Sequence, residues 1–154
     1  MMKEPPPARI DGRARFSAAL KGIRRLRNLT SAETAGLMNL SPRAYERFEA
    51  GETRPNRDYV FRFARVTNSD PHAIFVAVAI GAPEFAVHCA RNQMVTIMTN
   101  GLEDLAQDLG PDLAFLTARD ALEILTPMFE ALAARARANR DLQARIADQG
   151  RPRG

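Results

Sequence analysis

Two arginines four positions apart, Arg43 and Arg47, have the most specific chemistry that this sequence offers. Residues at i and i+4 lie on the same face of a helix. Each guanidinium group offers a planar fork that matches the O6 and N7 atoms of guanine, with about 1–3 kcal/mol of discrimination for a good pair. The pair is therefore predicted to contact base edges; the alternative is two solvated surface arginines.

The residues around this pair predict a short helix over 42–50. Ser41 is an N-cap residue, Pro42 stands at the first helical position, and Gly51 is suited to the left-handed position after the helix. Ala44 and Glu46 share the outward set with Pro42, Arg43 and Arg47. The methyl group of Ala44 suits the thymine methyl, and Glu46 suits cytosine N4.

A second short helix over 31–38 precedes the first. Thr30 is its predicted N-cap, and Glu33 completes a capping box. Asn39 suits a left-handed turn residue between the two helices. Apolar residues that hold the angle between them are Ala35, Met38, Leu40, Tyr45 and Phe48. This pattern is typical of a helix-turn-helix, in which 31–38 braces across the DNA backbone and 42–50 lies in the major groove.

Phosphate contacts are predicted on both sides of the reading helix. The N-terminus of the bracing helix directs free N–H groups and a positive dipole end outward, and Thr30 and Ser31 lie there. Arg54, Asn56 and Arg57 follow the reading helix in the next loop. Such contacts set the register on the duplex without reading sequence.

Three further helices complete an all-α domain over residues 14–81. The first begins near Ala14 with an apolar face, the next follows Asn56 as N-cap, and the last follows Asp70-Pro71 and runs to about Ile80. Their apolar residues are Phe16, Leu20, Ile23, Val60, Phe63 and Ala64.

Residues 16–80 resemble the XRE family of helix-turn-helix regulators, the lambda/434-repressor-like or Cro/C1-type domain. The matching positions include Leu20, Ile23, Arg24, Thr30, Ala35, Leu40, Ser41, Tyr45, Phe48-Glu49, Gly51, Pro55, Phe63-Ala64 and Asp70-Pro71. The resemblance implies a five-helix fold and a bacterial DNA-binding regulator that acts as a dimer on a palindromic site. It also implies a largely buried structural ion pair between Arg24 and Glu49. Thr34 and Thr67 depart from the family pattern, in which leucine is usual.

Residues 83–148 are predicted to form a C-terminal helical domain, with the boundary at Gly81-Ala-Pro83. One long helix is expected from Pro83 to about Leu109, although 94–99 could instead be a strand. A second helix is expected from Asp112, with Thr126-Pro127 kinking it or starting a new helix. Its stripe contains Phe115, Leu122, Leu125, Phe129 and Leu132. The stripe suits either an intrachain hairpin or a dimer seam.

Composition limits the function classes. Residues 1–70 carry 14 Lys and Arg against 8 Asp and Glu, whereas 71–154 carry 8 against 10, so the N-terminal half suits a polyanion. Residues 1–13 are predicted to be a disordered basic arm and 149–154 a disordered tail. Cys89 is a single, structural thiol, and no apolar run is long enough for a membrane helix. His72 and His88 lack companions at metal spacing, so no catalytic residue, metal or cofactor is predicted.

The predicted function is a sequence-specific, DNA-binding transcriptional regulator in the cytoplasm, associated with the nucleoid. Its predicted partners are double-stranded DNA and a second copy of the chain, with a homodimer expected. The alternative is a protein-interaction adaptor or antitoxin-like protein whose residues 83–148 bind a protein partner. No membrane partner is expected.

Overall fold

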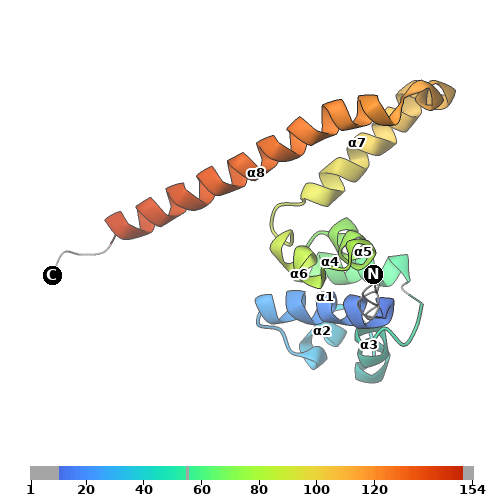
Figure 1. Cartoon of the computed structure of the whole chain (residues 1–154). Coiled ribbons are helices and arrows are strands. Elements are labelled where there is room, and N and C mark those ends of the chain that lie inside the picture. The colour runs from blue at the N-terminus through green and yellow to red at the C-terminus, as the bar shows by residue number, and fades with distance from the viewer. Residues whose placement is uncertain (1–10, 55, 151–154) are drawn as a thin grey trace, which may run out of the picture. The chain divides into compact units, whose positions relative to one another are not determined.

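The computed structural model describes residues 11–54 and 56–150, which form eight α-helices, one 3-10 helix and no strand (Figure 1). The chain divides into two compact units, Met1–Asp104 and Leu105–Gly154. Most of the predicted arm 1–13 and the predicted tail beyond 150 lie outside the described residues, as does Pro55. None of the described helices combines the length and the apolar character that a membrane span requires.

Five helices form the predicted N-terminal bundle. They are α1 (Gly12–Leu26), α2 (Ser31–Leu37), α3 (Pro42–Glu49), α4 (Arg57–Thr67) and α5 (Pro71–Ile80). Side chains cap the last four: Thr30, Ser41 and Asn56 at the predicted positions, and Asp70 immediately before Pro71. The turns use left-handed residues, since Asn28, Asn39 and Gly51 have φ values of 55°, 53° and 69°. The sequence therefore specifies each start and turn through local chemistry.

The core of this bundle is centred on Phe48, which is almost fully buried. Its ring lies 5.7 Å from the rings of Phe16 and Tyr59 and 6.2 Å from that of Phe63, measured between centroids. These contacts join α3 to α1 and α4. Other fully buried core residues are Leu20, Ile23, Met38, Tyr45, Val60 and Ile74. Because α3 supplies the central ring, its position is fixed by the core itself.

The first unit extends beyond the predicted boundary at 81–83, because α6 (Pro83–His88) packs against α1 and α5. Gly22 permits this close approach: a Cβ atom at that position would lie 2.6 Å from Cγ2 of Val87. The predicted single helix from Pro83 to Leu109 is in fact two helices, α6 and α7 (Met94–Leu109). A turn separates them, with Gln93 at a φ of 54°.

Asp70 fixes the start of α7 as well as that of α5. Its carboxylate accepts hydrogen bonds from the backbone N–H groups of His72 and Ala73 in α5, and from those of Val95 and Thr96 in α7. The Thr96 hydroxyl donates a further bond of 2.7 Å to Oδ1. One fully buried carboxylate therefore caps two helices, and residues 94–99 form a helix rather than the alternative strand.

The second unit contains the end of α7, the 3-10 helix η1 (Gly110–Phe115) and α8 (Ala118–Gln149). Thr117 caps α8 in a capping box with Asp120. The prediction that Phe115 shares a helix with Leu122 is therefore wrong, because the helix begins after Phe115. The helix continues through Pro127 rather than restarting there.

Candidate nucleic-acid interface

The α2–turn–α3 motif is held by local hydrogen bonds. The Thr30 hydroxyl accepts from the Glu33 N–H, while the Glu33 carboxylate accepts from the Thr30 N–H at 2.8 Å. The Thr30 hydroxyl also donates to Glu33 Oε2 at 2.9 Å. The pKa of Glu33 is lowered first by the bond from the Thr30 N–H and then by this hydroxyl bond. At α3, the Ser41 hydroxyl oxygen accepts from the Ala44 N–H. Between the helices, the Leu40 N–H donates to the Ala35 carbonyl at 2.9 Å, which closes the turn.

A buried polar cluster, formed by Arg24, Tyr45 and Glu49, fixes the inner face of α3. Arg24 Nε lies 2.6 Å from Glu49 Oε1, and the two side chains are only 14% and 6% exposed. The Tyr45 hydroxyl donates to the same oxygen at 3.0 Å. The hydrogen bond to Glu49 raises the pKa of Arg24. Burial first, and then the Glu49 charge, raise the pKa of Tyr45. The cluster therefore contains an ion pair beside a neutral phenol.

Two long-range arginine contacts support the motif, and the sequence pattern does not indicate either. Arg62 on α4 donates to the Met38 carbonyl at 3.1 Å and so caps the end of α2. Arg13 on α1 donates from Nε to the Gly51 carbonyl at 2.7 Å, just after α3. Both join residues at least 24 positions apart, and only the tertiary fold brings them together.

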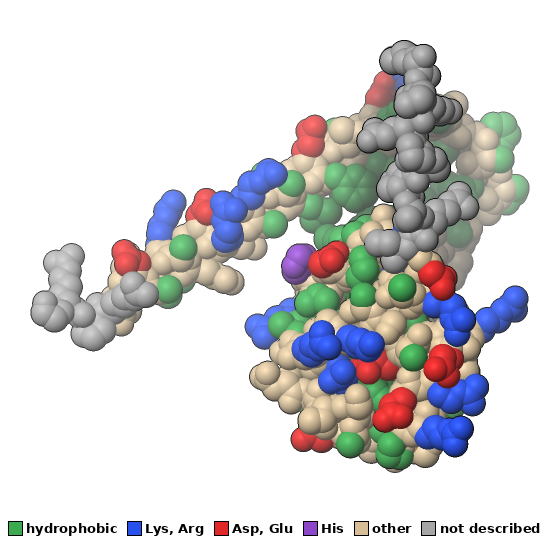
Figure 2. All heavy atoms as spheres, turned by 60° about the horizontal axis from the view of Figure 1, so that its bottom comes forward, with side chains coloured by type: hydrophobic (Ala, Val, Ile, Leu, Met, Phe, Trp, Pro, Cys, Tyr) green, Lys and Arg blue, Asp and Glu red, His purple; other side chains and the backbone are tan. Residues whose placement is uncertain are grey.

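The outward face of α3 carries the predicted base-reading residues. Pro42, Arg43, Glu46 and Arg47 are exposed, while Ala44 is half-buried. Arg47 Nε lies 3.4 Å from Glu52 Oε2, but both side chains stay more than half exposed. In water such a pair contributes at most about 1 kcal/mol, so Arg47 can leave Glu52 for another acceptor. Arg43 forms no ion pair with any described residue. Figure 2 shows basic side chains on this unit with acidic ones between them.

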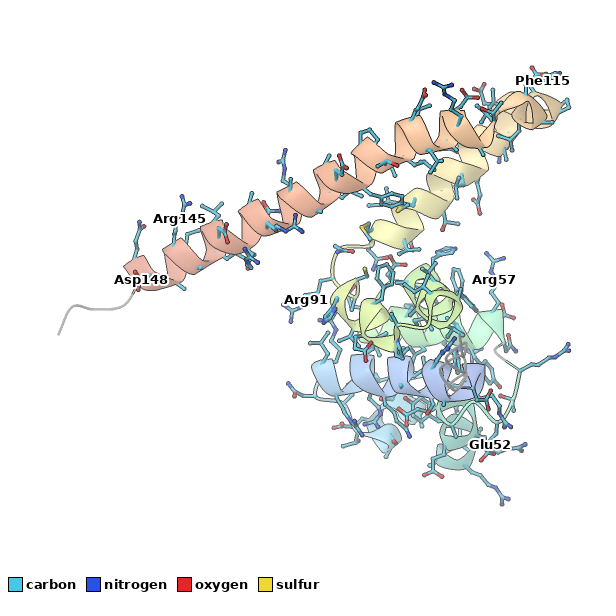
Figure 3. The ribbon with its side chains drawn as sticks, in the orientation of Figure 1. Glu52, Arg57, Arg91, Phe115, Arg145 and Asp148 are labelled. Atoms are coloured by element: carbon cyan, nitrogen blue, oxygen red, sulfur yellow. The ribbon has the colours of Figure 1, made fainter. Side chains whose placement is uncertain are left out.

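The predicted phosphate contacts fall into two groups. The N–H and hydroxyl of Thr30 are already bonded to Glu33, and the neighbouring Ser31 is half-buried. Arg54 in the loop and Arg57 at the start of α4 are exposed; Figure 3 labels Arg57. Arg57 places its guanidinium carbon 5.0 Å from the centroid of the Phe61 ring. The Asn56 side-chain oxygen accepts from the Asp58 N–H at 2.8 Å, which leaves the amide NH2 group as a donor. The loop therefore offers more donors than the start of α2.

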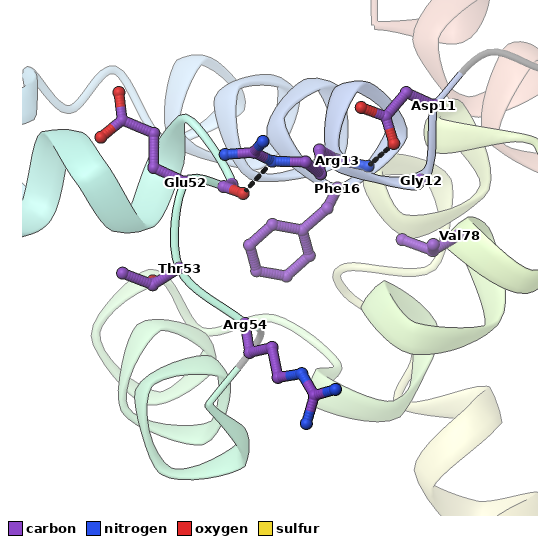
Figure 4. A pocket seen from close by; sticks show the side chains of 9 residues that line it. Asp11, Gly12, Arg13, Phe16, Glu52, Thr53, Arg54 and Val78 are labelled. Atoms are coloured by element: carbon purple, nitrogen blue, oxygen red, sulfur yellow. Dashed lines mark hydrogen bonds between the residues drawn. The ribbon is translucent and has the colours of Figure 1, made fainter.

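A pocket lies behind this loop (Figure 4). Phe16 and Val78 supply apolar side chains to it, and Arg13 closes one side through its bond to the Gly51 carbonyl. Gly51 is required at this place, because a Cβ atom there would lie 3.0 Å from the Arg13 carbonyl oxygen and φ is positive. The pocket therefore marks where the loop 51–54 rests against α1 and α5. No group of His, Cys, Asp or Glu in the described part of the chain is arranged to hold a metal ion.

These features define a helix-turn-helix domain: a bracing helix, a tight turn and a second helix with an outward polar face, all supported by an all-α core. A family model described as "Helix-turn-helix" matches residues 20–74, which contain the end of α1, the whole of α2, α3 and α4, and the start of α5. This domain belongs to the XRE, lambda-repressor-like family of DNA-binding regulators. The match ends before α6. No curated protein and no solved structure shows significant similarity to the chain.

Proposed function

We propose that the protein is a sequence-specific transcriptional regulator that reads the DNA major groove with α3. The observation that carries the proposal is the contrast between the two faces of this helix. Tyr45, Phe48 and Glu49 are buried in the core, whereas Arg43 and Arg47 are exposed on the opposite side. A side chain on a rigid helix loses less freedom on binding than one on a loop, which favours specific contacts.

Arg43 and Arg47 are the proposed base-reading residues, each donating to the O6 and N7 atoms of a guanine. Pro42, Ala44 and Glu46 complete the reading face. Ala44 contributes the least of the five residues, because its methyl group is half-buried.

The proposed phosphate contacts are made by the donors that flank α3. Arg54, Asn56 and Arg57 contact one side of the groove, and Ser31 the other. Thr30 contributes only if a phosphate displaces the Glu33 carboxylate from its N–H group. In this proposal the protein acts in the cytoplasm on nucleoid DNA, as a homodimer on a palindromic site.

A gel-shift titration tests the proposal with three variants of one substitution type. Arg43→Ala and Arg47→Ala are each expected to weaken binding to the preferred site by roughly 5- to 150-fold, the value of one bidentate guanine contact. Arg91→Ala is the matched control, because Arg91 is an exposed arginine in the turn between α6 and α7 (Figure 3). An equal effect of all three substitutions would refute the assignment of the base-reading residues.

A second candidate function is an adaptor or antitoxin-like protein whose C-terminal helices bind another protein. The observation that favours it is the number of large apolar side chains exposed along α8. Under this candidate, a stoichiometric partner of different sequence would co-purify through residues 83–148, and Arg43→Ala would leave that association unchanged.

A further inference from the structure

A second pocket of the first unit lies between α4, α5 and α7, and it is separate from the pocket behind the loop 51–54. Its volume is about 390 Å³, which is within the range of small-molecule sites. The lining residues are Arg57, Phe61, His72, Phe75, Thr99 and Glu103. None of them belongs to α3, so the base-reading face does not account for this pocket.

Three aromatic rings form the apolar part of the pocket. Phe61, His72 and Phe75 are each half-buried, so part of each ring stays accessible. The rings of Phe61 and His72 meet edge to face, with centroids 5.3 Å apart. Aromatic rings pack favourably against one another in edge-to-face and offset arrangements. The pocket therefore suits a ligand with an aromatic ring.

Hydrogen bonds hold the aromatic wall in place. The Thr96 hydroxyl donates to Oδ1 of the buried Asp70, so its oxygen must accept from His72 Nδ1, which lies 3.0 Å away. The same carboxylate caps the starts of α5 and α7, the helices on two sides of the pocket. The wall is therefore formed before a ligand arrives, which reduces the cost of binding.

Two unpaired charges of opposite sign also line the pocket. Arg57 comes from α4 and Glu103 from α7, and neither forms an ion pair with any described residue. The guanidinium carbon of Arg57 lies 5.0 Å from the centroid of the Phe61 ring, so this charge lies beside the aromatic wall. A ligand with one charge would match one of these residues and be repelled by the other. A ligand with both charges matches the pair.

We infer that this pocket binds a free aromatic amino acid. The ring packs against Phe61, His72 and Phe75, the carboxylate pairs with Arg57, and the ammonium group pairs with Glu103. A purely apolar occupant, such as the face of a partner helix, would cover both charges without replacing their contacts with water. The phosphates of a nucleic acid would be repelled by Glu103.

The same arginine connects the pocket to DNA binding, and this step rests on the proposed function. Arg57 is one of the proposed phosphate contacts, and a ligand carboxylate competes with phosphate for its guanidinium group. The bound amino acid therefore weakens DNA binding, and DNA weakens the binding of the amino acid by the same factor.

Calorimetry of the full chain without DNA provides the first test, with L-phenylalanine, L-tyrosine and L-tryptophan as probes. At least one should bind with a dissociation constant of about 1 mM or lower, as expected for a ligand of this size. L-alanine, which has both charges but no ring, should not bind measurably. The absence of binding by all three aromatic probes, or equal binding of L-alanine, would overturn the inference.

A ligand without the ammonium group tests the role of Glu103. For phenylalanine this analogue is 3-phenylpropionate, which should bind the wild type about fivefold more weakly, the value of one exposed ion pair. Glu103→Gln should bind the amino acid and its analogue within about twofold of each other. Glu84→Gln, the same change at an exposed residue of α6, should keep the fivefold preference. A preference that survives in Glu103→Gln would overturn the inference, and circular dichroism verifies that both variants are folded.

Fluorescence anisotropy with a labelled duplex tests the competition for Arg57. A saturating amino acid should weaken DNA binding and reduce the salt slope by about one for each Arg57 that it withdraws. In Arg57→Ala the amino acid should leave the slope unchanged. An amino acid that binds the wild type without changing the slope would overturn the competition. A protein that binds the amino acid but no DNA would contradict the proposed function alone.

Discussion

The Glu49 carboxylate is the group on which the orientation of α3 most depends. It accepts from both Arg24 and Tyr45, and it is almost fully buried at the inner side of the helix. Arg24 also donates to the Leu29 carbonyl at 3.0 Å, which joins the cluster to the chain before α2. A buried ion pair of this kind adds little to the free energy of unfolding, because both charges must leave water. Removing one partner alone is strongly destabilising, because the other charge is then buried without a counter-charge.

Replacement of Glu49 by glutamine tests this role. Glu49→Gln keeps the shape but leaves the Arg24 charge buried and unpaired, so the free energy of unfolding should fall by about 3–5 kcal/mol. Glu52→Gln is the matched control: the same chemical change at an exposed pair should alter stability by less than about 1 kcal/mol. Urea titration of both variants measures the difference. Equal effects would show that the buried cluster does not hold α3.

Tyr45 makes the same cluster sensitive to alkaline pH. Its pKa is raised in the folded state, so the fold favours the neutral phenol. Its contribution is fully present below the unfolded pKa, near 10, and is lost as the pH rises through the higher folded value. Tyr45→Phe should lower the free energy of unfolding by about 1 kcal/mol at pH 7, and the gap from the wild type should narrow above pH 10. A difference in the free energy of unfolding between wild type and Tyr45→Phe that stays constant up to pH 12 would contradict this role of Tyr45.

At the scale of elements, the N-terminal helices follow from local sequence, whereas their neighbours do not. Thr30, Ser41 and Asn56 are capping residues whose own side chains fix where a helix begins, so the sequence predicts those starts. The break between α6 and α7 was missed because Asp70, more than 20 positions earlier, caps the second helix. Asn92, whose side-chain oxygen accepts from the Met94 N–H, was the one local signal of that break.

Glycine substitutions test the packing of these elements. Gly22→Ala should force α1 away from α6, because the new methyl group would lie 2.6 Å from Val87, and overpacking of this kind costs about 1–3 kcal/mol. Gly36→Ala, in α2, meets no atom within 4 Å and should stabilise the protein by roughly 0.5–1 kcal/mol. Thermal denaturation shows whether each substitution raises or lowers the stability of the protein. Stabilisation by both substitutions would show that α6 does not pack closely on Gly22.

At the scale of the whole molecule, the domain and the exposed arginines of α3 could be predicted because helical period and capping are short-range properties. The division of the chain into its two units could not be predicted from the sequence. Helix α6 is apolar enough to join either unit, and only its contact with Gly22 and α5 assigns it to the first. Helix α8 runs unbroken through Pro127, which the Thr126-Pro127 pair in the sequence does not indicate.

The uneven charge of the chain leads to a prediction about salt. If α3 and the following loop neutralise phosphates in two copies, six or more contacts form. Affinity should then fall on the order of 10³-fold between 50 and 200 mM salt. Fluorescence anisotropy with a labelled duplex measures the slope, and Arg57→Ala should make it shallower for every DNA sequence. A salt-independent affinity would exclude the proposed phosphate contacts.

Selection of bound duplexes from a random DNA pool, followed by sequencing, tests the central claim most directly. The wild type should enrich an inverted repeat whose half-sites contain guanine. Arg43→Ala and Arg47→Ala should each lose base preference at a different position within the half-site. Arg91→Ala should reproduce the wild-type motif. Identical motifs from the wild type and both α3 variants, or no enrichment by the wild type, would contradict the account.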